Sequence, residues 1–285
     1  MKKALAFGVA LLGLALAQSV QVEVKGSLDR VLDRLVAALK AQGLEVDRNL
    51  NLGEQVRQVT GPGFPDYRLV VLKPEEGSAE AVAKNPMAAI VLPPTIYVHA
   101  FKPGVVTVGT FDGRLLFQML QVWTPKTEKL TWRLEAVLGS LGILKRIPPA
   151  LMPDPKSGLM PAILYLVPGM KAEEAVLLLE SELTSRGLNL TPNLKVGPLT
   201  VIMPCKSEWA RIMFETQAAG GFAAPCRFFA MDTPQGALVG AIEPMLMTIM
   251  PGVMNTPAVA MLQEAKRVIT EVLEATGGKP YRPAQ

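Results

Sequence analysis

The sequence predicts an α+β protein in which one small unit of strands and helices occurs twice. Three observations lead to this fold class. Segments with an apolar residue at every second position alternate with segments of helical spacing. The same order of segments starts again after a proline-rich stretch in the middle of the chain. A chain of 285 residues, 49% of them apolar, is long enough to bury about two cores.

The two halves share identical residues in register. At a shift of 144 the matching residues of the first half are Leu35, Leu39, Gly43, Leu44, Asn49, Leu50 and Gly53. At a shift of 132 they are Glu76, Pro93, Gly104, Thr124, Pro125 and Leu130. Such self-similarity indicates two copies of one supersecondary unit. Because the shift falls by twelve residues, the first copy is predicted to carry an insertion at about residues 54–72.

The first copy opens with a predicted strand, in which Val20, Val22 and Val24 alternate with polar residues. Ser27 is expected to cap the following helix and Gly43 to end it. A turn is expected at 49–53. Further strands are predicted at 44–47, 55–60, 67–72, 95–101 and 105–110, and further helices at 75–84 and 127–141.

The predicted boundaries divide the chain into five parts. Residues 145–161 contain five prolines and little periodicity, which is typical of a semi-rigid linker. A predicted strand at 162–167 and a helix at 172–186 then begin the second copy. The parts are a signal peptide at 1–17, a first copy at 18–144, a linker at 145–161, a second copy at 162–276 and a C-terminal tail at 277–285.

Residues 1–17 have the pattern of a secretory signal peptide. Two lysines precede an uncharged apolar run at 4–14, and Ala15 and Ala17 give the small-x-small pattern that signal peptidase accepts. Cleavage is expected before Gln18, which leaves an exported protein, periplasmic or secreted. An uncleaved membrane anchor is the alternative, although the apolar run is short for a membrane span.

The charge balance argues against a nucleic-acid partner. The formal net charge of +4 falls to +2 once Lys2 and Lys3 are removed with the signal peptide. Nucleic-acid binding needs clustered Lys and Arg facing phosphate, and this near-balance supplies no such footprint. No later apolar run is long enough to cross a bilayer, so no stable membrane span is expected after cleavage.

The second copy contains two cysteine steps that resemble a known family. Pro204-Cys205-Lys206-Ser207 precedes a short predicted helix, and Ala224-Pro225-Cys226 precedes a strand. Gln235-Gly236 and Glu243-Pro244 follow. This order resembles the domain of unknown function 302 family, whose members show a Cys-Asn-Pro-like step, a Leu-Pro-Cys step, a Gly turn and an Asp-Pro step. Here Lys206-Ser207 replaces Asn-Pro, and Glu243 replaces Asp.

The resemblance covers the second copy more closely than the first. In the first copy Lys73 and Pro94 occupy the two cysteine positions. The resemblance implies an antiparallel sheet with helices packed on one face, similar to the TATA-box-binding-protein-like architecture. It implies no established activity, and a shared architecture does not transfer DNA binding.

Cys205 and Cys226 form the first candidate site. If the strands before Cys205 and after Cys226 are antiparallel neighbours, both thiols lie at the same edge of the sheet. A disulfide is favoured in an exported protein with an even cysteine count, and two free buried thiols are the other structural interpretation. The functional alternative is a reactive pair: Ser207 would cap a helix after Cys205 and so lower the pKa of that thiol.

Methionine adds a metal-binding version of the same alternative. Met203 flanks Cys205, so both thiols and this thioether could hold Cu(I). Residues 245–254 hold four more methionines, whose spacing also fits ordinary core packing.

Large apolar residues around the two cysteines form the second candidate site. They would wall an apolar pocket between sheet and helices, and core packing explains the same pattern. They are Trp209, Met213, Phe222, Phe228, Phe229 and Met231.

Other chemistries lack the residues they need. His99 is the single histidine, so no second imidazole exists to complete a zinc site, and a Ser-His-Asp arrangement would have to use His99. No phosphate-cradling loop or nucleophile-elbow sequence is present. No catalytic residue, resident metal or cofactor is therefore predicted. The leading interpretation is an exported, non-enzymatic module that binds a small apolar molecule or a partner protein, and the alternative is a periplasmic thiol protein for disulfide exchange or Cu(I) handling.

Overall fold

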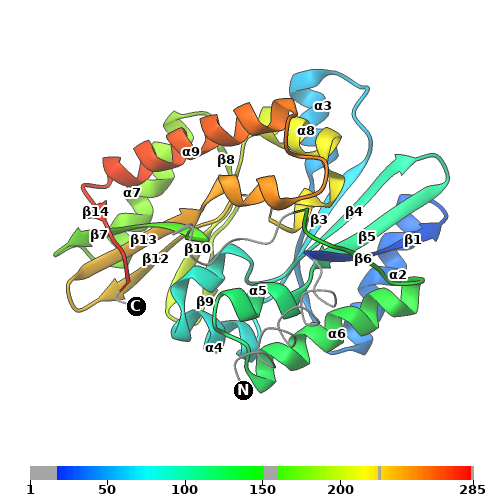
Figure 1. The fold of residues 1–285 in the computed structure, drawn as a ribbon, viewed down its shortest axis with the longest axis horizontal. Coiled ribbons are helices and arrows are strands. Elements are labelled where there is room, and N and C mark those ends of the chain that lie inside the picture. Colours follow the sequence, from blue (N-terminus) through cyan, green and yellow to red (C-terminus); the bar gives the residue numbers. More distant parts are fainter. Residues whose placement is uncertain (1–17, 151–159, 224–225, 284–285) are drawn as a thin grey trace, which may run out of the picture.

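Two six-stranded antiparallel sheets with helices packed against them make up the molecule (Figure 1). The computed structural model describes residues 18–150, 160–223 and 226–283. The predicted signal peptide, most of the predicted linker, and Ala224 and Pro225 of the second cysteine step lie outside the described residues. The structure confirms the predicted α+β class, and its two sheet units fit a two-copy arrangement.

The first sheet has the strand order β2-β3-β4-β5-β1-β6. Its strands are β1 (Ser19–Lys25), β2 (Val46–Asn51), β3 (Tyr67–Leu72), β4 (Thr95–Lys102), β5 (Val105–Phe111) and β6 (Lys145–Ile147). The helices of this unit are α2 (Leu28–Ala41), α3 (Leu52–Thr60), α4 (Glu76–Lys84), the 3₁₀ helix η1 (Pro86–Ile90), α5 (Gly113–Met119) and α6 (Pro125–Leu141). α2 and α6 cover one face of the sheet, and they form the lower right side of the molecule in Figure 1.

The second sheet has the order β14-β7-β13-β12-β10-β9. Its strands are β7 (Ala162–Pro168), β9 (Leu194–Val196), β10 (Leu199–Ile202), β12 (Phe228–Thr233), β13 (Gly236–Ile242) and β14 (Lys279–Pro280), with β8 (Asn189–Leu190) and β11 (Pro204–Cys205) as a separate pair. The helices are α7 (Ala172–Ser185), α8 (Ser207–Thr216), η3 (Ala218–Phe222), η4 (Pro244–Ile249) and α9 (Pro257–Ala275). α7 and α9 cover the outer face along the top left of Figure 1.

The two units have the same connectivity. Read from one edge, β2, β3, β4, β5, β1 and β6 of the first sheet match β9, β10, β12, β13, β7 and β14 of the second. Helices α2 and α7 differ by 144 residues at both ends, and η1 and η3 differ by 132 at both ends. These are the two shifts at which identical residues of the halves align in the sequence. The halves therefore correspond in their helices as well as in their residues.

Buried apolar spacing fixes the outer helices. In α2, the buried residues are Leu28, Val31, Leu32, Leu35 and Leu39, which recur every three or four positions along one stripe. Ser27 takes the N-cap position as predicted, but its side chain makes no capping hydrogen bond.

Residues 55–60, predicted as a strand, belong to helix α3, and the predicted turn at 49–53 is largely strand β2. Asn51 caps α3 by accepting a hydrogen bond from Glu54 N at 3.1 Å. Leu52 and Val56 are fully buried on this helix, which packs against α8 of the second unit. The tertiary contact therefore overrides the strand predicted at 55–60.

Short strands extend each sheet beyond the predicted unit boundaries. β6 lies in the predicted linker yet pairs with β1, and Arg146 of β6 reaches Asp112 Oδ2 at 2.8 Å and Glu135 Oε2 at 3.0 Å. β14 lies in the predicted tail and pairs with β7. The first unit therefore continues to Ile147, and the second to Pro280.

Each unit covers the inner face of the other unit's sheet with its 3₁₀ helix. η3 packs on β4 and β5 of the first sheet, and η1 packs on β10, β12 and β13 of the second. Tyr67 Oη donates a hydrogen bond to the Ala218 carbonyl at 2.6 Å, and the Phe214 ring stacks on Tyr67 with 4.0 Å between centroids. Thr95 Oγ1 donates to the Phe222 carbonyl at 3.0 Å.

Equivalent residues of the two units meet each other at this interface. Arg227 Nη2 donates to Thr95 Oγ1 at 2.8 Å, and these residues are 132 apart. Arg48 donates to the Pro192 carbonyl, and these residues are 144 apart. Contacts between equivalent positions are the property of an isologous, two-fold interface. The units therefore pack as the two halves of a pseudo-symmetric dimer within one chain.

Gly221 is the closest point of this interface. A Cβ at this position would lie 1.9 Å from Tyr67 Oη and 2.8 Å from Tyr97 Cβ. Only a residue without a side chain allows η3 to approach the sheet this closely.

Gly221→Ala is accordingly expected to lower the free energy of unfolding by about 1–3 kcal/mol, the usual cost of overpacking a core. Urea denaturation followed by circular dichroism measures it. Gly63→Ala is the matched control, since nothing lies within 4 Å of a Cβ there. Equal unfolding midpoints for both variants would contradict the close approach.

Candidate functional site

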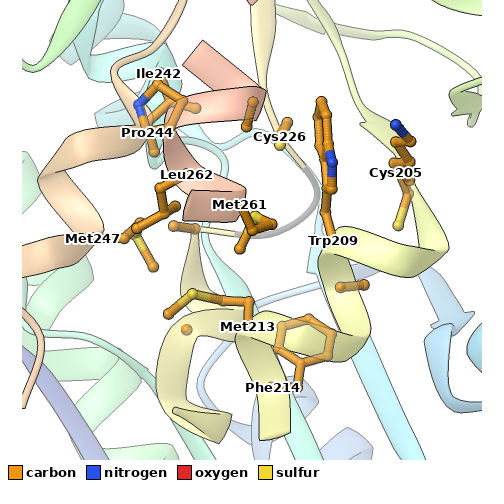
Figure 2. A pocket seen from close by; sticks show the side chains of 15 residues that line it. Cys205, Trp209, Met213, Phe214, Cys226, Ile242, Pro244, Met247, Met261 and Leu262 are labelled. Carbon is orange, nitrogen blue, oxygen red and sulfur yellow. The ribbon is translucent and has the colours of Figure 1, made fainter. Parts of the chain in front are cut away.

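An apolar cavity of about 80 Å³ lies in the second unit, between helices α8 and α9 and the 3₁₀ helices η3 and η4 (Figure 2). Both cysteines of the chain line it. The full lining is Cys205, Lys206, Trp209, Ala210, Met213, Phe214, Gly220, Ala223, Cys226, Ile242, Pro244, Met247, Met261, Leu262 and Ala265.

Helical spacing brings the walls together. α8 contributes residues 209, 210, 213 and 214, which share one face at spacings of one and four. α9 contributes residues 261, 262 and 265 in the same pattern from the opposite side. η4 adds Pro244 and Met247. The cavity is therefore bounded by faces of α8 and α9 together with residues of η3 and η4.

The sheet register places both cysteines beyond one end of the same strand pair. β10 and β12 are antiparallel, with Ile202 opposite Phe228. Cys205 follows three residues after Ile202, and Cys226 precedes Phe228 by two. Cys205 lies in the short ladder β11, opposite Asn189 of β8. The fold thus brings to one cavity two thiols that are 21 residues apart in the sequence.

Both cysteines are free thiols, Cys205 buried and Cys226 partly exposed. Burial raises the pKa of Cys205 to about 12, and the neighbouring Cys226 and Glu208 add to the rise. Burial likewise raises the pKa of Cys226 to about 11. Ser207 is the first residue of α8, whose N-cap is Lys206 without a side-chain cap, so the predicted Ser207 cap is wrong. The predicted lowering of the Cys205 pKa fails because desolvation of a thiolate outweighs the helix end.

Five sulfur-bearing side chains line the cavity: Cys205, Cys226, Met213, Met247 and Met261. In Figure 2, Cys226 and the three methionines surround one space, whereas Cys205 lies on the other side of the Trp209 ring. Met203, predicted to accompany the thiols, is fully buried and is not part of the lining.

The predicted pocket residues divide into two groups. Trp209 and Met213 line the cavity. Phe228 and Phe229 are fully buried in β12 and serve the core, as the packing interpretation had it. Phe222 lies in η3 at the interface with the first unit, and Met231 is partly buried in β12. None of these four residues is in the lining.

One positively charged side chain lies at the rim of the cavity. Lys206 is the one charged residue among the described lining residues, and its Nζ lies 4.7 Å from the centre of the Trp209 ring. The same Nζ forms an ion pair with Glu264 Oε1 of α9 at 3.2 Å. A cation–π contact and a salt bridge therefore connect the start of α8 to α9 beside the cavity.

The first unit holds different residues at the positions that line the cavity in the second. Trp209 corresponds to Gly77, where a Cβ would lie 3.1 Å from the Lys126 carbonyl of α6. Gly77 leaves this position of α4 without a side chain, whereas the Trp209 indole of α8 lines the cavity. The five sulfur positions correspond to Lys73, Pro94, Ala81, Leu115 and Lys129.

His99 lies outside this site, in an aromatic cluster on the inner face of the first sheet. Its ring stacks with Tyr67 at 5.6 Å and meets Phe101 edge-on at 4.9 Å. Burial, with Lys102 nearby, lowers the pKa of His99 to about 4, so it packs as a neutral ring. Across the described ranges, no three His, Cys, Asp or Glu side chains group closely enough to hold a metal ion.

Three lining residues of α9 were not predicted: Met261, Leu262 and Ala265. The available signal was the repeat itself, because the predicted helix at 127–141 shifted by 132 places a helix over these positions. The lining residues from η3 and η4, which are Gly220, Pro244 and Met247, have no periodic signal of that kind.

Comparison with known family models finds one match, and it lies on the first unit. Residues 20–141 match the family described as "Domain of unknown function DUF302". The first unit is therefore similar to DUF302 domains. The motifs resemble DUF302 more closely in the second unit, yet the match lies on the first, which contains no cysteine. The match to DUF302 therefore does not depend on the thiols.

One similar solved structure is titled "Crystal structure of uncharacterized conserved protein DUF302 from Bacillus stearothermophilus". It shares 18% sequence identity with this chain at a TM-score of 0.39, and the alignment covers 43% of this chain and 97% of that one. No curated protein matches. Among the helices described, none has the length and apolar character needed to span a membrane.

The raised pKa values predict poor thiol reactivity. In the native protein at pH 8, iodoacetamide should modify both cysteines at least about 100-fold more slowly than in urea, with Cys226 ahead of Cys205, because thiolate is the reacting form. Mass spectrometry of timed samples measures the rates, and Cys205→Ser isolates the contribution of Cys226. Native rates equal to those in urea would refute the buried-thiol geometry.

Proposed function

We propose that this protein is an exported, non-enzymatic binding module whose second unit holds a small apolar molecule in the cavity between α8 and α9. The observation that carries the proposal is the lining: apart from Lys206 at the rim, the described lining residues are apolar or sulfur-bearing. A concave apolar pocket with few polar groups is the usual form of a small-molecule site.

One buried donor suggests the polar feature of the ligand. Trp209 is 5% exposed, and its Nε1 finds no hydrogen-bond partner among the residues described. A buried donor without a partner costs free energy, and an acceptor on a ligand would recover it. The proposed ligand is therefore a compact apolar molecule with one neutral acceptor atom, such as a small ketone or ether.

Disulfide exchange by Cys205 and Cys226 has less support than binding of an apolar molecule. It needs an accessible thiolate of lowered pKa, whereas burial raises the pKa of both Cys205 and Cys226. The apolar walls favour a neutral ligand instead.

Export rests on the pattern of residues 1–17, with two lysines, an apolar run and a small-x-small step. The test is mass spectrometry of the chain recovered from a secreting host. A mature chain that begins at Gln18 supports export, and a full-length cytoplasmic chain contradicts it.

A matched pair of probes tests the binding proposal. Cyclopentanone and cyclopentane differ by one acceptor, so the ketone should bind about 3- to 10-fold more tightly, as expected for one net hydrogen bond. At ten times its Kd, the ketone should raise the free energy of unfolding by about 1.4 kcal/mol. Trp209→Phe should remove the preference for the ketone while keeping an apolar wall. Native mass spectrometry would show any ligand that co-purifies.

Two alanines of α9 provide the control. Ala265 lines the cavity and Ala260 is exposed on the same helix. Ala265→Leu fills the cavity and should abolish probe binding, whereas Ala260→Leu should leave it unchanged. ¹³C-methyl NMR of Met213, Met247 and Met261 locates the probe, with the exposed Met254 as an internal reference. Probe binding that survives Ala265→Leu would rule out this cavity as the site.

A further inference from the structure

We propose that the same cavity is a binding site for a soft monovalent cation, Cu(I), with Cys226 as the anionic ligand and Met213, Met247 and Met261 as thioether ligands. This inference uses the cavity described above but a different ligand chemistry, and it does not require the apolar ligand to exist. It rests on ligand type, charge balance and a comparison of the two units.

Ligand type is the first argument. Cu(I) selects thiolate and thioether sulfur over nitrogen and oxygen ligands. Four sulfur side chains from separate elements surround one space in Figure 2: Cys226 before β12, Met213 of α8, Met247 of η4 and Met261 of α9. The flexible methionine side chains can adjust to a bound ion within a cavity of about 80 Å³.

Charge balance explains why a single cysteine is enough to bind Cu(I) in this cavity. Binding replaces the thiol proton of Cys226 with Cu(I): the S–H bond breaks, a sulfur–copper bond forms, and the proton leaves to solvent. No electron is transferred, and the cavity keeps its net charge. An apolar site favours this neutral product, whereas two thiolates on one Cu(I) would bury a net negative charge. Cys205, beyond the Trp209 ring, is therefore assigned no bond to the ion.

Comparison of the units addresses core packing as an explanation of the sulfur. The first unit has the same elements, but the positions of Met213, Met247 and Met261 hold Ala81, Leu115 and Lys129. The position of Cys226 holds Pro94. The shared architecture thus forms without any sulfur at these positions, so the fold alone does not account for four of them in one cavity.

Anaerobic titration of the reduced full chain tests the proposal. Cu(I) is added against a chromogenic Cu(I) chelator, and Ag(I) serves as a redox-inert second probe. The expected result is one ion per chain, an all-sulfur shell by X-ray absorption, and no displacement by excess Zn(II), which is less soft. Binding of no ion, or a shell with nitrogen or oxygen ligands, would overturn the proposal.

Variants identify the ligands. Cys226→Ser should weaken Cu(I) binding at least about 100-fold, and each of Met213→Leu, Met247→Leu and Met261→Leu about 10-fold, since a thiolate contributes more than a thioether. Met254→Leu is the control at a methionine that is 46% exposed and outside the cavity, and Cys205→Ser should also leave the affinity within about threefold. Equal losses for Met254→Leu and Met261→Leu would refute the site.

Thermal unfolding without the ion shows that each variant is folded, and cyclopentanone binding reports on the cavity independently. In the unsubstituted chain, ketone binding without Cu(I) binding disproves only the metal site. Intact Cu(I) binding without ketone binding disproves only the apolar-ligand proposal.

Discussion

The mutual covering of the two sheets by the 3₁₀ helices is the constraint on which the rest of the structure depends. η3 can lie on the first sheet only because Gly221 has no side chain to meet Tyr67 and Tyr97. Since η3 directly follows α8, its anchoring also sets where α8 ends and how Phe214 stacks on Tyr67. The interface between the units therefore positions one wall of the cavity.

A pseudo-two-fold interface gives each unit a partner without a second chain. Thr95 and Arg227 occupy equivalent positions and contact each other, but they are no longer the same residue. Arg227 is fully buried, and its Nε and Nη1 have no hydrogen-bond partner among the residues described. Burial alone lowers its pKa to about 9. Because the two units belong to one chain, equivalent positions can hold different residues. Here the two sides of the interface differ in their chemistry.

Local patterns in the sequence predicted most of the regular elements, because their physical cause is local. The spacing in α2 and the alternation in β1 follow directly from which face is buried. Helix α3 could not be read this way, since Leu52 and Val56 are buried by α8 from the other unit. β6 was likewise hidden in a proline-rich segment. It joins the sheet by pairing with β1, and Arg146 adds ion pairs to Asp112 and Glu135.

The site follows the same division between local and tertiary causes. The expected strand order placed both thiols beyond one end of a strand pair. In the structure, the register of β10 with β12 gives them this position. That a cavity would lie beside them did not follow, because it depends on which side chains of α8, α9, η3 and η4 meet there. At the position of Trp209 the first unit has Gly77, where a Cβ would lie 3.1 Å from the Lys126 carbonyl of α6, whereas the Trp209 ring lines the cavity of the second. The two copies, alike in fold, therefore present different side chains at this position.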